Sequence, residues 1–452
     1  MTHDSRVSEE TISIERAERV DEQLVRAIGV PGLTANIVNS TIGAGIFVLP
    51  ALVAKGLGPA APLAFIACAI AMVLFVTCFA IAGSRVSLTG GLYAYVEVAF
   101  GRYVGFVAGV LYGITAISAV AGVGNVLVDS LGGLVPLLGN SIVRVGLMFV
   151  IYLTLVIINL RGVGGGAGAV GAVTVAKLLP ILLFLFIGIF FINRANIGWS
   201  VWPSSEELGN SILLLIFAFV GIEVALIPSG EVKNPARTVP RAAYLALVST
   251  TVIYITIQLV AQGTLGAGLA NYPKTPLAEA AAIFLGNIGR TILIFGAAVS
   301  AFGFVASDIL SSPRMIFAFG RDGLLPAWFA HVHPRYRSPD VAIITYAAIA
   351  FILSVCSSFE QLAVLSNVAI LLMYLLCCAS VWPLIRREVP PDQRALVFPG
   401  MRIVPALAIG AILWLFWLTQ PWDKFAKIGA ILLGASILYF LRAKFRSIQP
   451  AS

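Results

Sequence analysis

Three ionisable side chains lie inside long apolar stretches of the sequence. Lys177 occurs in GAVTVAKLLP, Glu223 in FAFVGIEVALIP and Asp308 in FGFVASDILSS. A charge at the centre of a membrane-spanning helix costs about 2.5–3.5 kcal/mol on insertion scales, so such residues usually bind ions, carry protons or control a gate. We therefore expect these three residues to serve coupling or gating, provided that the stretches around them cross a membrane.

The other residue types argue against an enzyme or a metal protein. His3, His331 and His333 fall outside the apolar stretches, and the five cysteines have neither metal-ligand spacing nor the loops of a disulfide framework. The glycine-rich segment 161–171 lacks the Gly-Lys-Ser/Thr that completes a phosphate-binding loop. We expect no enzymatic activity, no cofactor and no bound metal.

The composition is that of a polytopic membrane protein. Of the 452 residues, 59% are hydrophobic and 11% are charged, whereas soluble domains carry about 25% charged residues. A membrane-spanning helix needs about 20 apolar residues, and the sequence has room for twelve. The predicted spans are 31–54, 61–83, 103–130, 141–160, 167–192, 209–229, 242–263, 288–318, 340–357, 361–383, 402–419 and 424–441.

The positive charges predict how these spans are oriented. With residues 1–30 inside, 21 of the 29 Lys and Arg residues fall on one side, seven fall on the other and Lys177 lies within a span. Cytoplasmic loops retain Lys and Arg, so we expect cytoplasmic tails at 1–30 and 442–452 in a multi-pass protein of the cell (inner) membrane. The net charge of +8 then reflects topology, and we expect the lipid bilayer, not nucleic acid, as a partner.

The first predicted span contains a weak point, NSTIGAGIFVLP at 39–50, with two glycines and a proline. A broken helix in lipid leaves backbone N–H and C=O groups without partners, and it is tolerated only where protein or a wet cavity satisfies them. The segment GAGI (43–46) should therefore line a site. The alternative is that these small residues only allow two helices to pack closely.

A second interrupted span favours the site. The sixth span contains Gly221 and then Pro228 and Gly230, and each break lies in the first helix of a five-span block, 31–192 or 209–383. Because five is odd, the second block enters the membrane in the opposite sense. Interrupted helices at matching positions of inverted halves point to a transporter's binding site. Free amides suit a carboxylate and free carbonyls suit an ammonium group, which together favour a small zwitterion.

Four ordered motifs resemble those of the amino acid–polyamine–organocation superfamily between about residues 30 and 385. They are GAGIF (43–47), TGGLYAYVEVAFG (89–101), FVGIE followed by EVKNPARTVPRA (219–223 and 231–242), and SSPRMIFAFGRDGLLP (311–326). The resemblance implies an all-α integral membrane protein with twelve transmembrane helices. It implies a five-plus-five inverted repeat of the leucine-transporter type, with helices one and six discontinuous. Two C-terminal helices, 402–441, fit by number alone.

The resemblance also implies a substrate site at the two breaks. The backbone of 43–45 would bind the α-carboxylate of an amino acid, and the carbonyls of 217–219 would bind its amino group. Phe217 stands where some relatives for cationic amino acids have tryptophan, which puts stacking on a guanidinium in doubt. The expected substrate-binding residues are Ser40, Thr41, Gly43, Ala44, Gly45, Ile46, Phe217, Ala218, Phe219, Gly221 and Ile222.

The resemblance gives each intramembrane charge a candidate role. Lys177 would occupy the place of a sodium ion, bridging the first and eighth spans and releasing a proton during the cycle; alternatively, it extends to the membrane interface. Glu223 is either a gating, proton-carrying carboxyl or a cap for the freed amides. Asp308 either neutralises Lys177 or faces a cytoplasmic vestibule. Two serines, Ser300 and Ser307, are further candidate partners of Lys177.

The sequence thus predicts a secondary active amino acid transporter that works by alternating access. Neutral amino acids are favoured, and proton symport and amino acid exchange are both open. A cationic amino acid or polyamine antiporter is an alternative, and a channel or a transporter-like sensor is an alternative of another class. The expected partners are an amino acid, protons and the bilayer, and either a monomer or a homodimer fits.

Overall fold

The computed structural model describes residues 28–86, 91–161, 167–198, 202–223, 232–321, 323–387 and 396–446. Within these ranges the chain is helical, and the only β-type pairing is an isolated bridge between Ile28 and Val232. This agrees with the predicted all-α class.

The described α-helices are α2 (Val30–Thr41), α3 (Leu49–Leu57), α4 (Ala61–Gly83), α5 (Leu92–Phe100), α6 (Arg102–Gly132), α7 (Ser141–Arg161), α8 (Ala167–Gly188), α9 (Ser205–Phe219), α10 (Pro235–Leu265), α11 (Pro276–Ser311), α12 (Pro313–Arg321), α13 (Asp340–Cys356), α14 (Phe359–Ile385), α15 (Val404–Thr419) and α16 (Trp422–Arg446). Short 3-10 helices connect them: η1 (Ala44–Phe47), η2 (Gly58–Ala60), η3 (Pro136–Gly139), η4 (Ile189–Phe191), η5 (Arg194–Asn196), η8 (Gly266–Asn271) and η9 (Ala327–Ala330).

In the described part of the chain, eight helical segments are long and apolar enough to cross a membrane. Two further apolar helices, α13 and α15, are shorter. The outermost helices α7 and α16 bury little of their surface and expose large apolar side chains such as Phe149, Leu433 and Ile437. Surfaces of this kind would be a liability in water, and they suit contact with lipid tails.

Local sequence explains where several helices begin. Ser204 starts α9 with a capping box, in which its hydroxyl accepts from the Glu207 N–H and the Glu207 carboxylate accepts from the Ser204 N–H. Ser358 and Gln361 start α14 in the same way. Such caps satisfy amides that a helix leaves free in its first turn.

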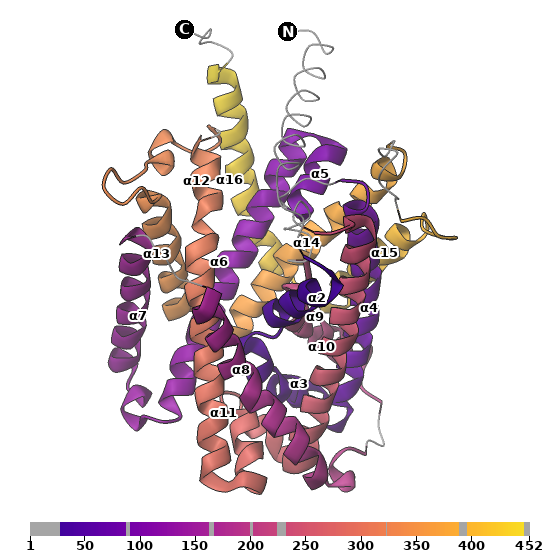
Figure 1. Cartoon of the computed structure of the whole chain (residues 1–452), viewed down its shortest axis with the longest axis vertical. Helices are drawn as coiled ribbons and strands as arrows, with labels where there is room; N and C mark the ends of the chain where they lie inside the picture. Colours follow the sequence, from indigo (N-terminus) through magenta and orange to yellow (C-terminus); the bar gives the residue numbers. More distant parts are fainter. Residues whose placement is uncertain are drawn as a thin grey trace.

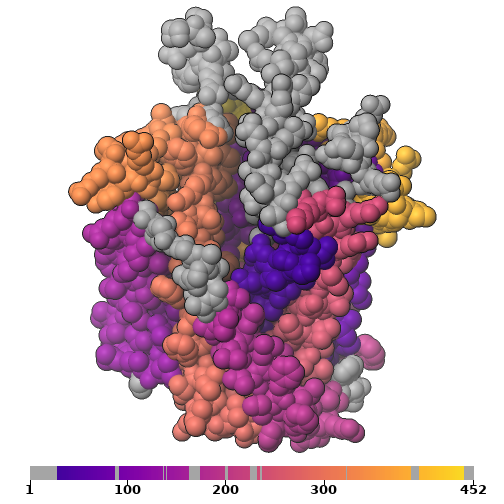
Figure 2. Space-filling model, viewed as in Figure 1, coloured from indigo at the N-terminus to yellow at the C-terminus, as the bar shows by residue number. Residues whose placement is uncertain are grey.

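The helices pack around a central group made of α2, α3 and α9 (Figure 1). Helices α4 and α10 lie on one side of this group, and α6 and α11 lie on the other. Helix α6 packs along both α11 and α14, and α10 packs along α2 and α4. On the face drawn in Figure 2, α2 reaches the surface between α8 and α10.

The first predicted break is present. Helix α2 ends at Thr41, Gly43 is extended (φ −101°, ψ −165°), and the chain passes through η1 before α3 starts at Leu49. The second break begins as predicted: α9 ends at Phe219, and Val220 is extended (φ −61°, ψ 134°). Residues 224–231, with the predicted breakers Pro228 and Gly230, lie outside the described residues.

The two breaks are in direct contact through glycines. Gly221 has a φ of +111°, and a Cβ atom there would lie 2.9 Å from the carbonyl oxygen of Ser40. A Cβ atom on Gly45 would lie 2.9 Å from Cδ1 of Phe217. Both approaches are shorter than any side chain allows, so the absence of a side chain at these positions lets the broken segments meet.

Replacing Gly221 with alanine should lower the free energy of unfolding by about 1–3 kcal/mol, because a residue with a Cβ is strained at this φ and also meets Ser40. Thermal unfolding of the purified protein in detergent measures the effect. Gly146→Ala is the matched control, since a Cβ on Gly146 of α7 meets no atom within 4 Å. Equal melting temperatures for the two variants would contradict the prediction.

Candidate functional site

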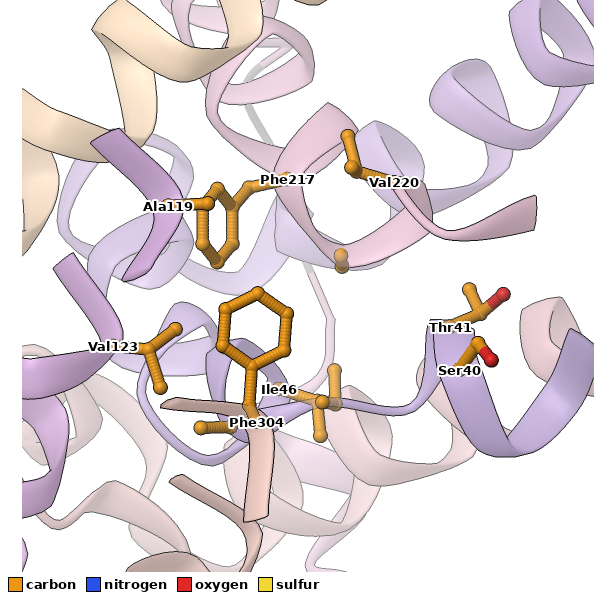
Figure 3. Close-up of a pocket in the computed structure, with 12 residues that line it drawn as sticks. Ser40, Thr41, Ile46, Ala119, Val123, Phe217, Val220 and Phe304 are labelled. Atoms are coloured by element: carbon orange, nitrogen blue, oxygen red, sulfur yellow. The ribbon is translucent and has the colours of Figure 1, made fainter. Parts of the chain in front are cut away.

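A pocket lies between the two breaks, in the centre of the helix bundle. Its cavity volume is about 30 Å³, enough for water but well below the roughly 300–1,000 Å³ that is typical of ligand pockets. The two breaks are therefore closely packed in this conformation. Its lining residues are Ser40, Thr41, Gly43, Ala44, Gly45, Ile46, Ala119, Val123, Phe217, Ala218, Val220 and Phe304. Figure 3 places the rings of Phe217 and Phe304 beside Ala119 and Val123, opposite Ser40 and Thr41.

The structure brings most of the expected substrate-binding residues to this pocket. Phe219, Gly221 and Ile222 are not part of its lining: the Phe219 ring is buried and packs edge-on against Tyr254, with centroids 5.3 Å apart. Sequence reasoning missed Ala119 and Val123 of α6, Val220 of the second break and Phe304 of α11. As apolar residues in apolar helices, they carry no signal that separates a pocket wall from ordinary core.

A buried tyrosine joins the ends of the two half-helices. Tyr254 of α10 directs its hydroxyl at the carbonyl oxygens of Thr41 and Ala218, each 2.9 Å away. One hydroxyl has a single hydrogen, so the two carbonyls share it or receive it in turn. This residue was also missed, and its signal would have been a tyrosine hydroxyl in a buried span, which usually needs a partner.

Lys177 contacts the first break, as the sequence analysis expected. Its ammonium group donates to the carbonyl oxygen of Ile42 at 3.0 Å and also to that of Asn39, at the end of α2. Both acceptors would otherwise be carbonyls exposed by the end of the helix. The ammonium is therefore directed at the backbone of the first break.

Glu223 caps the second break. Its Oε2 atom accepts from the Gly221 N–H at 3.0 Å and from the Tyr374 hydroxyl of α14 at 2.9 Å. The side chain is buried, with a relative exposure of 7%. The capping alternative thus describes this conformation, and Glu223 links the second break to α14.

Asp308 does not contact Lys177. Its carboxylate accepts from Ser312 at 2.7 Å and from the hydroxyl of Tyr346 on α13. Among the described residues, no ion pair joins Asp308 to a cation.

The two candidate serine partners of Lys177 differ in their surroundings. Ser300 is buried and its hydroxyl has no hydrogen-bond partner, whereas Ser307 is exposed. Neither forms a hydrogen bond with the Lys177 ammonium, which is directed at α2. Within the described part of the chain, no three His, Cys, Asp or Glu side chains converge as a metal site would require.

Comparison with known proteins decides the family. A family model described as amino acid permease matches residues 28–439. The chain belongs to the amino acid permease family. With the apolar helices described above, this makes the permease a multi-pass membrane protein.

Three curated relatives are similar over nearly their whole length. The serine/threonine exchanger SteT of Bacillus subtilis is 29% identical over 92% of this chain and 95% of its own. The branched-chain amino acid permease BcaP of the same bacterium is 25% identical over 94% and 95%. The methylthioribose transporter of Bacillus subtilis is 28% identical over 97% of both chains. The names of these relatives differ in substrate, so substrate choice must be argued from the pocket.

Replacing Lys177 with methionine should lower the melting temperature of the permease. Two carbonyls at the end of α2 would lose their donor, and an unsatisfied buried group costs about 1–3 kcal/mol. Thermal unfolding of the purified protein in detergent measures the effect. Lys55→Met is the control, because Lys55 is exposed at the end of α3. A melting temperature equal to that of the control would contradict the prediction.

Replacing Tyr254 with phenylalanine should weaken substrate binding while the fold is kept. The ring can still pack against Phe219, but the hydroxyl that joins Thr41 to Ala218 is lost, at about 1 kcal/mol or fivefold in an equilibrium constant. Initial rates in proteoliposomes should give a KM raised by about this factor. Tyr272→Phe, at an exposed loop position, should leave KM unchanged. Equal KM values for both variants would contradict the prediction.

Proposed function

We propose that this permease is a secondary active transporter of neutral amino acids that works by alternating access. The observation that carries the proposal is the pocket formed where the two broken helices meet. A cavity lined by unwound backbone inside a membrane bundle is the setting in which free amides and carbonyls can be exposed without penalty.

The polar ends of the substrate would bind to backbone. The segment from Gly43 to Gly45 leaves the helix and lines the pocket. The Gly43 N–H donates to the Thr41 carbonyl at 2.9 Å, so the amides of Ala44 and Gly45 are the ones that suit the α-carboxylate. Carbonyls of the second break suit the ammonium group. Because Ala218 already receives the Tyr254 hydroxyl, the tyrosine would help to set which carbonyls remain free.

The rest of the pocket suits an uncharged side chain. The wall opposite Ser40 and Thr41 is apolar, and none of the twelve lining residues carries a charge. The Glu223 carboxylate is not among them and already accepts two hydrogen bonds. A cationic side chain would enter without a partner, and burying an unpaired charge is costly. This disfavours the cationic amino acid and polyamine alternative.

The contacts between helices support the twelve-span inverted repeat. If the halves correspond span by span, α2 matches α9, α4 matches α10, α6 matches α11, and α8 matches α14. Helix α6 packs on α14, and their counterparts in the other half, α11 and α8, also pack on each other. In the same way, α2 packs on α10, and their counterparts α9 and α4 pack on each other. Two further contacts, α4 with α10 and α6 with α11, each join a helix to its own counterpart in the other half.

The expected orientation follows from charge. The excess of Lys and Arg on one side supports cytoplasmic termini in the cell membrane. In the proposed cycle, one group of helices rocks around the pocket, with Lys177 and Glu223 holding the broken ends.

Transport by the purified permease in proteoliposomes tests the proposal. Labelled neutral amino acids should enter with saturable kinetics and be stimulated by amino acid on the opposite side, whereas a channel would show neither. In detergent, the transported amino acid at a hundredfold excess over its dissociation constant should stabilise the fold by about 2.7 kcal/mol. Arginine should give less stabilisation than leucine or serine. Stabilisation by cationic amino acids alone would overturn the neutral assignment.

A further inference from the structure

Asp308 lies one helical turn beyond Phe304, the α11 residue that lines the pocket. Residues four apart on an α-helix share a face, with Cβ atoms roughly 5–6 Å apart. The carboxyl is therefore adjacent to the substrate pocket, on the side that the charge distribution assigns to the cytoplasm. It is half-buried.

The two partners of Asp308 are both hydroxyl groups. Ser312 Oγ lies 2.7 Å from Oδ1, and the Tyr346 hydroxyl bonds to Oδ2. A hydroxyl can donate or accept, so these partners can satisfy an ionised carboxylate and also a protonated carboxyl that donates its own hydrogen. The site can thus take up and release a proton without losing a hydrogen bond.

Glu223 is held differently. One donor to its Oε2 atom is the backbone N–H of Gly221, and a backbone amide can only donate. Protonation of that oxygen would cost this hydrogen bond and release the cap of the second break. The Oε2 atom of Glu223 is therefore a fixed acceptor, whereas both oxygens of Asp308 meet hydroxyls that allow exchange.

The charges around Asp308 leave room for a small cation. In the described ranges, no Lys, Arg or His is in ion-pair contact with it. An ionised carboxylate buried without a cation is costly, and a proton removes that cost. The titratable and charged groups on the helices packed around it are Tyr346 of α13, Tyr112 of α6, Tyr152 of α7, Lys177 of α8 and Arg314 of α12.

Of these groups, the tyrosines lie within electrostatic range of Asp308. Lys177 instead donates to the carbonyls of α2. Tyr112 is also within range of Glu223, so it lies near both carboxyls.

We propose that Asp308 is the site that binds the coupled proton, held between Ser312 and Tyr346 next to the amino acid. In the loaded transporter, the proton and the amino acid occupy neighbouring turns of α11, and both are released when the cytoplasmic side opens. This inference rests on the proposed transport function and makes proton symport the coupled mode, with Lys177 and Glu223 as positioning residues of the breaks.

Proteoliposomes separate the proton step from substrate binding. A pH gradient, acidic outside, should drive accumulation of labelled amino acid by the wild-type permease into vesicles that contain no amino acid. Asp308→Asn keeps an acceptor for the hydroxyls but does not titrate, so it should lose this accumulation and still exchange labelled for unlabelled amino acid at equal pH. Asp308→Glu should restore part of the accumulation. Asp423→Asn, far away at the exposed start of α16, should behave as wild type.

Tyr346→Phe gives a second measurement. It removes one hydroxyl from the carboxyl without changing the carboxyl, so the pH dependence of accumulation should shift along the pH axis while exchange continues. If Asp308→Asn fails to fold, as judged by its melting curve, this shift decides the question, and an unshifted profile overturns the inference.

The outcomes distinguish the proposed proton site at Asp308 from the proposed transport function. Gradient-driven accumulation by Asp308→Asn at the wild-type level overturns the proton site. Wild-type exchange without any gradient-driven accumulation also overturns it, and the transport function stands. If the wild-type protein neither exchanges nor accumulates neutral amino acids, the proposed transport function itself is wrong.

Discussion

The structure depends on how backbone groups stranded at two broken helices find partners away from water. In the hydrocarbon region an unpaired amide or carbonyl costs several kcal/mol, so each break needs side chains from elsewhere. Lys177 supplies hydrogens to the carbonyls at the end of α2, Tyr254 supplies one to both half-helices, and Glu223 accepts from the second break. Helices α8, α10 and α14 are thereby tied to the centre.

The proposed transport function divides recognition between backbone and side chains. The backbone at the breaks suits the carboxylate and ammonium groups that all amino acids share, and it is fixed by packing contacts such as Gly221 against Ser40. The apolar side chains of α6 and α11 border the remaining space.

The chemistry of hydrogen-bond partners separates the two intramembrane carboxyls. The Oε2 atom of Glu223 receives a hydrogen from a backbone amide, which can only donate. Asp308 meets two hydroxyls, which can donate or accept. In the sequence, both residues are acidic side chains within apolar stretches, and only their hydrogen-bond partners in the structure distinguish them.

The sequence by itself determined the all-helical membrane character, both weak points and the residues at the first break, because apolar runs, glycines and buried charges are local features with direct physical costs. It did not determine whether Asp308 pairs with Lys177, or that Tyr254, Ala119 and Phe304 belong to the site. Those facts depend on which faces of distant helices meet. An apolar residue looks the same from sequence whether it faces a neighbouring helix, lipid or a pocket, and only the packed bundle decides between them.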